Sequence, residues 1–303
     1  NSYVTDVERS AEEDGKSARD RWHRHLYREG TDGGHFVRAA DGSVAEKDAL
    51  GFDHAVVDLT SASARAWMKG VIAAMADEQV EVSAGAPIER AGSSGWMADF
   101  AEGLPCDGVT LADGRDPCAY HSQYATDWAE LNRQVLRETG REGDTFFWSR
   151  SGYTTGPRSS TLYWLMDSLT TWDKYDGMGS ALTASVSCGM SGISLNHADL
   201  GGCARTPRDP PEILTRGAGL NQRPRRAALS APTWHRRYTG ATYLSWFGWL
   251  FHFDAEHYVR GPELLMRWQE LGAFAGVVYR SHEGIHRNAN TQPWSTDATL
   301  AHF

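Results

Sequence analysis

Gly95-Trp96-Met97-Ala98-Asp99-Phe100-Ala101-Glu102-Gly103-Leu104-Pro105 is an apolar run that ends on a carboxylate between two large rings. The run predicts a buried strand, with Asp99 at its end. An unpaired charge is costly away from water, so an acid in such a place is either paired or functional. Asp99 is therefore the first candidate for a catalytic residue.

Similar short apolar segments recur along the chain, and each leads into polar or charged residues. Helical patterns lie between them, and this alternation predicts a parallel sheet. Functional residues at successive strand ends favour an α/β fold of the (β/α)8 TIM barrel type. A doubly wound sheet is the alternative, which the lack of a GxGxxG loop weakens. The predicted strands are Ala55–Val57, Trp96–Ala98, Phe146–Trp148, Ile193–Leu195 and Val277–Tyr279.

Four segments have the apolar spacing of helices. Their ends are marked by Thr60 as an N-cap, Gly140 as a C′ residue and Pro262 as a first helical residue. The third pattern is weaker because it is rich in Ser, Thr and Gly. The segments are the stripe of Ala64, Trp67, Met68, Val71, Ile72 and Met75, then Tyr124 to Val135, Met178 to Met190, and Pro262 to Gly272.

Two segments interrupt the repeat. Residues 204–259 begin with many Arg and Pro residues and continue with aromatic residues. The basic half invites a nucleic-acid interpretation, but the Pro and Gly content favours an insertion that is irregular or partly disordered. Residues 79–94 are also longer than a tight connection requires. We therefore expect a partial catalytic barrel in residues 1–203, an insertion in 204–259 and a continuation of the barrel in 260–303.

The composition is that of a globular protein with a sizeable core. The chain has 303 residues, of which 41% are hydrophobic and 23% are charged. Its net charge of −9 disfavours nucleic-acid binding, which needs a basic surface. The longest uncharged apolar run, Thr239–Phe253, is too short to span a membrane, which takes about 20 residues. We expect a small-molecule partner, and the oligomeric state is left open.

The cysteines and the start of the chain say little about the compartment. The cysteines at 106, 118, 188 and 203 form no CxxC pair and imply no disulfide framework, so a reducing, cytoplasmic compartment is slightly favoured. No HExxH motif is present, and we expect no metal and no cofactor. The chain begins at Asn1 and shows no signal peptide, which leaves secretion open.

Asp167 is a second acid among rings, between Trp164 and Trp172. Two carboxylates in aromatic surroundings suit glycosidic bond cleavage. A retaining glycosidase needs an ionised nucleophile and a carboxyl that keeps its proton, which an apolar setting promotes. Asp99 suits the first role and Asp167 the second. Two alternatives stay open: a structural Asp99 that accepts backbone N–H bonds, and a solvated Asp167 in a loop.

The run from Gly95 to Pro105 closely resembles the nucleophile motif of the sulfoquinovosidases in glycoside hydrolase family 31. Most other members of that family carry a WxDMNE-like form. Further segments resemble the family in order, and they cover most of the chain outside the two interrupting segments. They are Val57-Asp58-Leu59-Thr60, Arg150-Ser151-Gly152 with Ser159-Ser160-Thr161, Trp164 with Asp167 and Trp172, His197-Ala198-Asp199-Leu200-Gly201-Gly202, Glu263 to Trp268, and Arg280-Ser281-His282-Glu283-Gly284.

The resemblance implies a (β/α)8 barrel that hydrolyses an α-glycoside with retention. It makes Asp99 the nucleophile that attacks the anomeric carbon, and Asp167 the acid/base. A structural ion pair for Arg150 and a core position for His282 are the alternatives to sugar binding. The substrate-binding residues that it implies are Arg150, His282, Asp199, Trp96, Trp164 and His197.

The chain departs from the family pattern in three places. Leu165 and Met166 precede Asp167 where the family usually has a glycine before the acid, and a bulky Met could crowd the leaving group. Cys203 follows the paired glycines, where the sulfoquinovosidases have a tyrosine that helps to hold the sulfonate. The family's sulfonate-binding Arg and Trp, first barrel strands and β-sandwich domain precede the part matched here. We therefore expect an incomplete chain.

Three functional hypotheses follow. The first is an α-sulfoquinovosidase that acts on sulfoquinovosyl glycerol or glycosides derived from sulfolipid. The second is a family 31 α-glucosidase or α-xylosidase that acts on neutral sugars. The third, from another class, is an inactive barrel fragment or a non-catalytic sugar-binding remnant.

Overall fold

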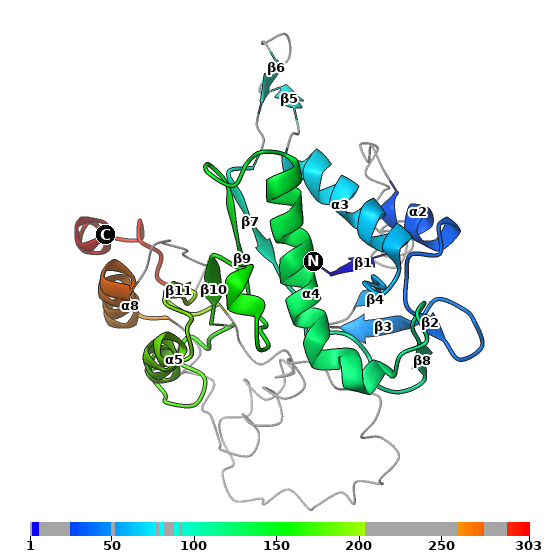
Figure 1. Cartoon of the computed structure of the whole chain (residues 1–303). Coiled ribbons are helices and arrows are strands. Elements are labelled where there is room, and N and C mark those ends of the chain that lie inside the picture. The colour runs from blue at the N-terminus through cyan, green and yellow to red at the C-terminus, as the bar shows by residue number, and fades with distance from the viewer. Residues whose placement is uncertain are drawn as a thin grey trace, which may run out of the picture. The chain divides into compact units, whose positions relative to one another are not determined.

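The computed structural model describes residues 2–5, 25–49, 52–76, 79–81, 88–90, 93–165, 167–203, 260–275 and 290–303. They belong to two compact units (Figure 1). Unit 1 comprises Asn1–Trp164 with Gly192–Leu195, and unit 2 comprises Leu165–Ser191 with Asn196–Phe303. The expected insertion 204–259, the strand at 277–279 and His282 lie outside the described residues.

Unit 1 contains three parallel strands in the order β7-β9-β10. They are β7 (Gly95–Ala98), β9 (Phe146–Ser149) and β10 (Leu162–Trp164). β7 and β9 confirm two strands predicted from the sequence, whereas β10 was not predicted. The carboxyl ends of parallel strands meet at one edge of a sheet. This arrangement therefore gathers the residues that follow β7 and β9.

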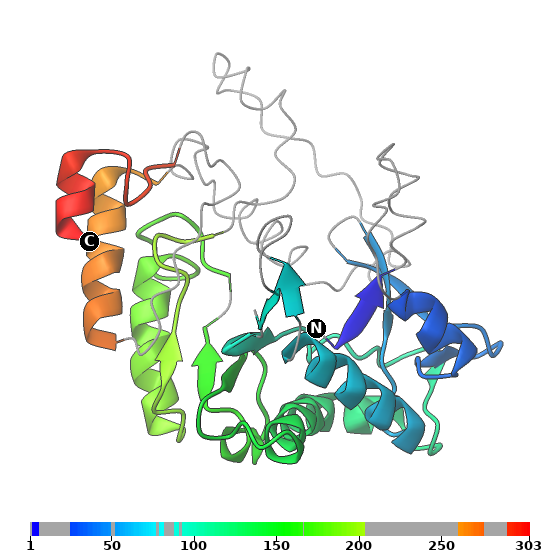
Figure 2. The same ribbon diagram turned by 90° about the horizontal axis from the view of Figure 1, so that it is seen from above.

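Helix α4 (Pro117–Glu138) packs on β7 and β9 and lies beside α3 (Ala62–Ala76), as Figures 1 and 2 show. Asp116 is its N-cap and accepts a hydrogen bond from the Cys118 N–H at 3.0 Å. The predicted end is confirmed, because Gly140 follows the C-cap with a φ of 68°, a conformation that suits glycine. Its buried face includes Tyr120, Tyr124, Trp128, Leu131, Val135 and Leu136.

Helix α3 buries one stripe, in which the residues lie four positions apart. The predicted periodicity is confirmed, but the cap differs, because Ser61 Oγ accepts the Ala64 N–H at 3.3 Å while Thr60 binds Asp58. Met75, which the sequence places in the stripe, is 40% exposed. The stripe consists of Ala64, Met68, Ile72 and Ala76.

A second sheet in unit 1 is antiparallel and has the order β1-β4-β3. It contains β1 (Tyr3–Thr5), β3 (Glu46–Ala49) and β4 (Phe52–Val56). The strand before Asp58 was expected in the parallel sheet, and the structure instead pairs it antiparallel on both sides. The cause is local: β3 and β4 are joined by a two-residue connection, which only antiparallel strands allow.

Smaller elements complete unit 1. Strand β5 (Gln79–Glu81) pairs with β6 (Ile88–Arg90) as an antiparallel hairpin, which accounts for the length of the connection that ends at Ser94. Strand β2 (Arg38–Ala39) pairs with β8 (Val109–Thr110). The unit also contains helix α2 (Leu26–Asp32) and the short helix η1 (Gly156–Arg158).

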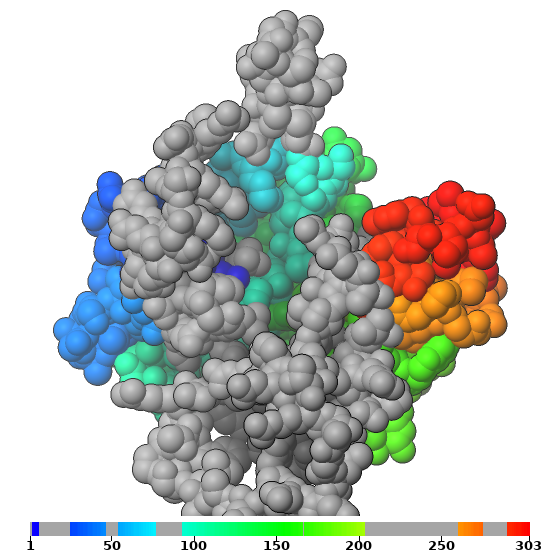
Figure 3. Space-filling view, turned by 180° about the vertical axis from the view of Figure 1, so that it is seen from behind, coloured from blue at the N-terminus to red at the C-terminus, as the bar shows by residue number. Residues whose placement is uncertain are grey.

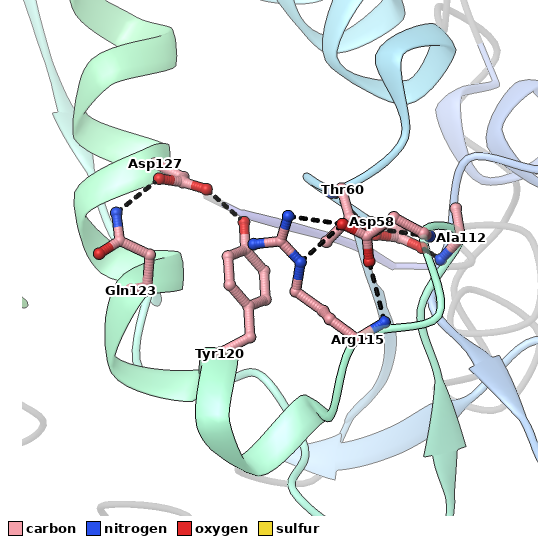
Figure 4. Close-up of polar contacts among 8 residues, drawn as sticks. Asp58, Thr60, Ala112, Arg115, Tyr120, Gln123 and Asp127 are labelled. Carbon is pink, nitrogen blue, oxygen red and sulfur yellow. Dashed lines mark hydrogen bonds and ion pairs between the residues drawn. The ribbon is translucent and has the colours of Figure 1, made fainter.

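The segment after β4 is fixed by the buried carboxylate of Asp58 (Figure 4). Its Oδ1 accepts hydrogen bonds from the N–H and the hydroxyl of Thr60 at 2.9 and 2.6 Å, and its Oδ2 accepts the Ala112 N–H at 2.7 Å. In the same segment the Arg115 guanidinium forms an ion pair with Asp113 at 2.5 Å and lies 4.6 Å from the ring centre of Tyr120, which donates to Asp127. Asp58 thus joins the segments that precede α3 and α4.

Asp58→Ala is expected to lower the free energy of unfolding by about 2–4 kcal/mol, because three donors lose their acceptor in a buried place. Urea denaturation followed by tryptophan fluorescence measures this change. Asp41→Ala is the matched control, because Asp41 accepts similar bonds from Ser43 in an exposed turn and its loss should cost under about 0.5 kcal/mol. Equal losses in the two variants would contradict the role of Asp58.

Unit 2 contains α5 (Met178–Met190), β11 (Asn196–His197), α8 (Pro262–Ala275) and α9 (Asp297–His302). Helix α8 packs on α5, β11 and α9, and Figure 3 shows α8 and α9 side by side in orange and red. Helix α5 is confirmed, and α8 begins at Pro262 as predicted but runs three residues past Gly272. The core of the unit consists of Ala181, Ala198, Leu200, Leu264 and Trp268.

A disulfide joins Cys106, in the segment after β7, to Cys118 in the first turn of α4. The same segment contacts α4 a second time, because the Leu104 carbonyl lies 2.7 Å from His121 Nδ1. Cys188 and Cys203 are free thiols. Among the described residues, no helix combines the length and the apolar character that a membrane span requires.

Candidate active site

Asp99 lies directly after β7, and its side chain is buried. Its Oδ1 accepts the N–H of Phe100 at 2.7 Å and lies 3.1 Å from Arg150 Nε. Phe100 has a φ of 63°, which is a strained conformation for a residue with a side chain. The Gly103 N–H closes this turn on the Phe100 carbonyl at 3.0 Å. The turn therefore sets the carboxylates of Asp99 and Glu102 against one cation.

That cation is Arg150, which follows β9. It forms ion pairs with Asp99 and Glu102, and Glu102 also accepts a hydrogen bond from the Ser151 hydroxyl. The guanidinium carbon lies 4.5 Å from the ring centre of Phe100 and 5.3 Å from that of Trp164. Stacked rings and two carboxylates hold Arg150 in one orientation. Arg150 therefore does form the structural ion pair that was named as the alternative to sugar binding.

The surroundings of Asp99 act on its pKa in opposite directions. Burial raises the pKa of the carboxyl above its ordinary value of 3.8, whereas Arg150 and the Phe100 N–H lower it and Glu102 raises it further. The net direction is upward. Burial and then the charge of Asp99 also raise the pKa of Tyr3 to about 12. Arg150 is thus the main group that keeps Asp99 ionised.

The two tryptophans expected in the site lie in different places. Trp164, in β10, is buried beside Arg150. Trp96, in β7, donates its indole N–H to Asn132 of α4 at 2.8 Å and stacks on Phe147. The Trp96 side chain therefore lies in the core between the sheet and α4. The structure brings Trp164 to the Asp99–Arg150 pair and does not bring Trp96 there.

In unit 2, Asp167 lies close to Asp199 and Cys203. One ligand-type atom from each of the three side chains lies within 4.8 Å of the others, and the Cys203 thiol donates to Asp167 Oδ1 at 3.3 Å. Asp199 and Cys203 are buried. Asp167 is thus not simply a solvated loop residue, since it has a buried hydrogen-bond donor.

These three side chains are the group in the described part of the chain with donor atoms close enough to hold a metal ion. Burial, then the charges of Asp199 and Asp167, raise the pKa of the Cys203 thiol well above its usual range. Cysteine ligates metals as the thiolate. In this structure the thiol serves as a hydrogen-bond donor to the Asp167 carboxylate.

The loop between Asp167 and α5 is shaped by Asp173. Its Oδ1 accepts the N–H groups of Tyr175 and Asp176, both at 2.8 Å, and its other oxygen accepts the Thr171 hydroxyl. Asp176 donates from its backbone here and has a carboxyl pKa raised to about 7 by burial and by the charges of Asp173 and Asp167. The sequence alone did not indicate a role for these acids or for Glu102. Asp173 could have been found, because an Asp that accepts N–H bonds two and three residues later is a common turn signal.

His197 lies in β11 and is buried in unit 2. It lines a hollow with Leu165, Leu200, Trp268 and other mainly apolar residues. The hollow lies where β11 packs on α5 and α8. His197 thus occupies the interior of unit 2, two residues before Asp199.

The model of the glycosyl hydrolase family 31 TIM-barrel domain matches residues 4–303. The chain belongs to glycoside hydrolase family 31. This match confirms the family and the α/β barrel class that the sequence predicted. Because the match extends to residue 303, it includes Asp99, Asp167 and His282.

Relatives of this family 31 chain include two sulfoquinovosidases. That of Agrobacterium fabrum (strain C58) is 30% identical over 270 residues, which cover 89% of this chain and 31% of the relative. That of Escherichia coli (strain K12) is 31% identical over 274 residues, covering 88% of this chain and 31% of the relative. A family 31 sulfoquinovosidase from E. rectale, solved with the aza-sugar inhibitor IFGSQ, matches with a TM-score of 0.67 and 29% identity, covering 91% of this chain and 32% of that one. The chain thus spans about a third of the length of these relatives.

Proposed function

We propose that this family 31 chain hydrolyses α-sulfoquinovosides with retention, by a double displacement that uses Asp99 and Asp167. The observation that carries the proposal is the buried Asp99 carboxylate at the end of β7, ion-paired at 3.1 Å with Arg150. A strand end is where barrel enzymes keep their reactive groups. The similarity to sulfoquinovosidases over most of this chain supports the choice of sugar.

Asp99 is the nucleophile in this proposal. Among the described residues, the Phe100 N–H and Arg150 Nε both contact Oδ1 of its carboxylate. We therefore assign Oδ2 as the atom that bonds to the anomeric carbon. Arg150 favours the ionised carboxylate, which the attack requires, and the Phe100 N–H fixes its rotation.

Asp167 is the acid/base in this proposal. It gives its proton to the leaving oxygen in the first step and takes a proton from water in the second, as the two-carboxylate mechanism requires. We propose that Arg150, Trp164, Asp199, His197 and His282 contribute to sugar binding. Trp96 is assigned to the support of β7 on α4, because its N–H is bonded to Asn132.

We further propose that residues 1–203 and 260–303 contribute to one catalytic barrel, with residues 204–259 as an insertion. The family match from residue 4 to residue 303 supports a single domain across both parts. The same family accommodates the neutral-sugar hypothesis, so the test of substrate class has to be direct.

The test compares an aryl α-sulfoquinovoside with the matching aryl α-glucoside on one preparation of the full natural protein. We expect kcat/KM to favour the sulfonated sugar by about tenfold or more, because charge-assisted hydrogen bonds to an anion are the strong ones. A preference for the glucoside would support the neutral-sugar hypothesis instead. Turnover of neither glycoside by a protein that melts cooperatively would support the inactive barrel.

A further inference from the structure

Cys203 ends the turn that follows β11, and it is held against the segment that carries Asp167. Its N–H donates to the Ser168 carbonyl at 2.9 Å, and its Sγ lies 3.3 Å from Asp167 Oδ1. Cys203 as a whole is only 5% exposed. A backbone bond and a side-chain bond therefore join Cys203 to two consecutive residues, so the main chain fixes the position of the thiol.

The close approach depends on the glycines that precede Cys203. Gly202 has a φ of 75°, and a Cβ on it would lie 2.6 Å from the Leu169 carbonyl oxygen. The Gly202 N–H closes the turn on the Asp199 carbonyl at 2.9 Å. The buried Arg260 guanidinium supports the same turn, with bonds to the carbonyls of Leu200 and Gly202 at 3.4 and 3.3 Å. These contacts fix the backbone that carries the Cys203 thiol.

The chemistry of the thiol suits a donor. Burial, the charges of Asp199 and Asp167, and hydrogen bonding to both carboxylates raise the pKa of Cys203, so the thiol keeps its proton near neutral pH. A hydrogen bond to an ionised carboxylate is stronger than one to a neutral acid. The bond to Asp167 therefore strengthens as Asp167 gives up its proton, and an interaction of that kind stabilises a transition state.

We propose that Cys203 is a positioning residue for the acid/base: its thiol donates to Asp167 Oδ1, fixes the rotation of the carboxyl and directs the catalytic proton to Oδ2. The proton leaves Oδ2 for the glycosidic oxygen in the first step and returns to Oδ2 from water in the second. The thiol proton stays on sulfur throughout. The inference rests on the acid/base role proposed for Asp167.

The kinetic test uses Cys203→Ala, Cys203→Ser and the matched control Cys188→Ala, which removes the other free thiol. An alkyl α-glycoside needs acid assistance, whereas a dinitrophenyl α-glycoside leaves without it. We expect Cys203→Ala to lower kcat/KM about tenfold for the alkyl substrate and less than about twofold for the dinitrophenyl one. Cys203→Ser keeps a donor and should restore most of the loss.

Equal losses on both substrates would overturn the proposal, because a structural defect does not distinguish leaving groups. So would wild-type behaviour of Cys203→Ala. If the Ala variant does not fold, the Ser variant is used for the test. A folded Cys203→Ser protein that loses kcat/KM about tenfold on the alkyl substrate alone would contradict the assignment, because its hydroxyl can still donate a hydrogen bond.

A second measurement needs no turnover. The rate at which iodoacetamide alkylates Cys203 is followed against pH by peptide mass spectrometry, in the wild type and in Asp167→Asn. Without this carboxylate, the alkylation rate of Cys203 should begin to increase at a lower pH than in the wild type. Asp41→Asn, in an exposed turn, should leave the dependence of the rate on pH unchanged. An unchanged profile in Asp167→Asn would overturn the contact itself. If the contact holds and neither glycoside is hydrolysed, the proposed function fails and the thiol contact does not.

Discussion

Asp99→Asn is expected to lower kcat/KM for an aryl α-sulfoquinovoside by roughly 10⁴-fold or more, the scale of losing an essential catalytic group. The amide keeps an oxygen for the Phe100 N–H but cannot bond to the anomeric carbon. The loss should be the same for good and poor leaving groups, because both need the nucleophile. Asp41→Asn, in an exposed turn, is the control and should keep full activity.

Azide, as an external nucleophile, provides a stereochemical test of the same assignment. In Asp99→Ala the removed carboxylate leaves space beside the anomeric carbon, and added azide should restore turnover of a dinitrophenyl α-glycoside. The product should be the β-glycosyl azide, because azide enters from the side of the nucleophile. An α-glycosyl azide, or activity in Asp99→Asn close to that of the wild type, would contradict the assignment.

The pKa of Asp99 adds a dependence on pH. Because this pKa is raised above 3.8, kcat/KM of the wild type should fall with decreasing pH while the pH is still above 3.8. A carboxyl with a raised folded-state pKa favours the fold below its unfolded pKa, and this contribution is lost as pH rises through the folded value. Asp99→Asn should therefore be no less stable than the wild type at neutral pH, as thermal unfolding can measure.

Asp167→Ala is expected to lower kcat/KM for an alkyl α-glycoside by about 10²–10⁴-fold, the usual contribution of general acid catalysis. For a dinitrophenyl α-glycoside the first step should remain fast, because that leaving group needs no proton. The covalent intermediate should then accumulate, since the base for the second step is missing. Burst kinetics followed by release of the phenolate measure this change.

The product with azide again distinguishes the roles. In Asp167→Ala, azide should attack the intermediate in the second step and give the α-glycosyl azide, the opposite anomer to that from Asp99→Ala. A loss of equal size for both leaving groups would contradict the acid/base role of Asp167.

The elements that the sequence predicts well are those with a repeated local signal. The stripe of α3 and the Gly140 end of α4 follow from spacing and from glycine conformation, and both are present. Strand β10 has three residues, and its identity depends on its pairing with β9, which no local pattern encodes. The antiparallel pairing of β4 with β1 was likewise missed, because it joins segments about 50 residues apart in the sequence.

In the candidate site, too, local features could be predicted from the sequence, whereas contacts between distant segments could not. The position of Asp99 at a strand end followed from the run that precedes it, whereas the pairing with Arg150 joins residues 51 positions apart and needed the fold. The orientation of Trp96 away from Asp99 could have been predicted from the sequence. Successive side chains of a strand point to opposite faces, so Trp96 and Asp99, three positions apart, point away from each other. The contact of Cys203 with Asp167 depends on the turn at Gly202.

The measurement that tests the central claim most directly is the identification of the labelled carboxylate. A 5-fluoro-α-glycosyl fluoride of the preferred sugar traps the covalent intermediate, because the ring fluorine slows the second step and the fluoride leaving group keeps the first step fast. Peptide mass spectrometry then locates the added mass. We predict one label, on Asp99, and none in Asp99→Asn. A label on another carboxylate, or turnover of the reagent by Asp99→Asn, would contradict the account.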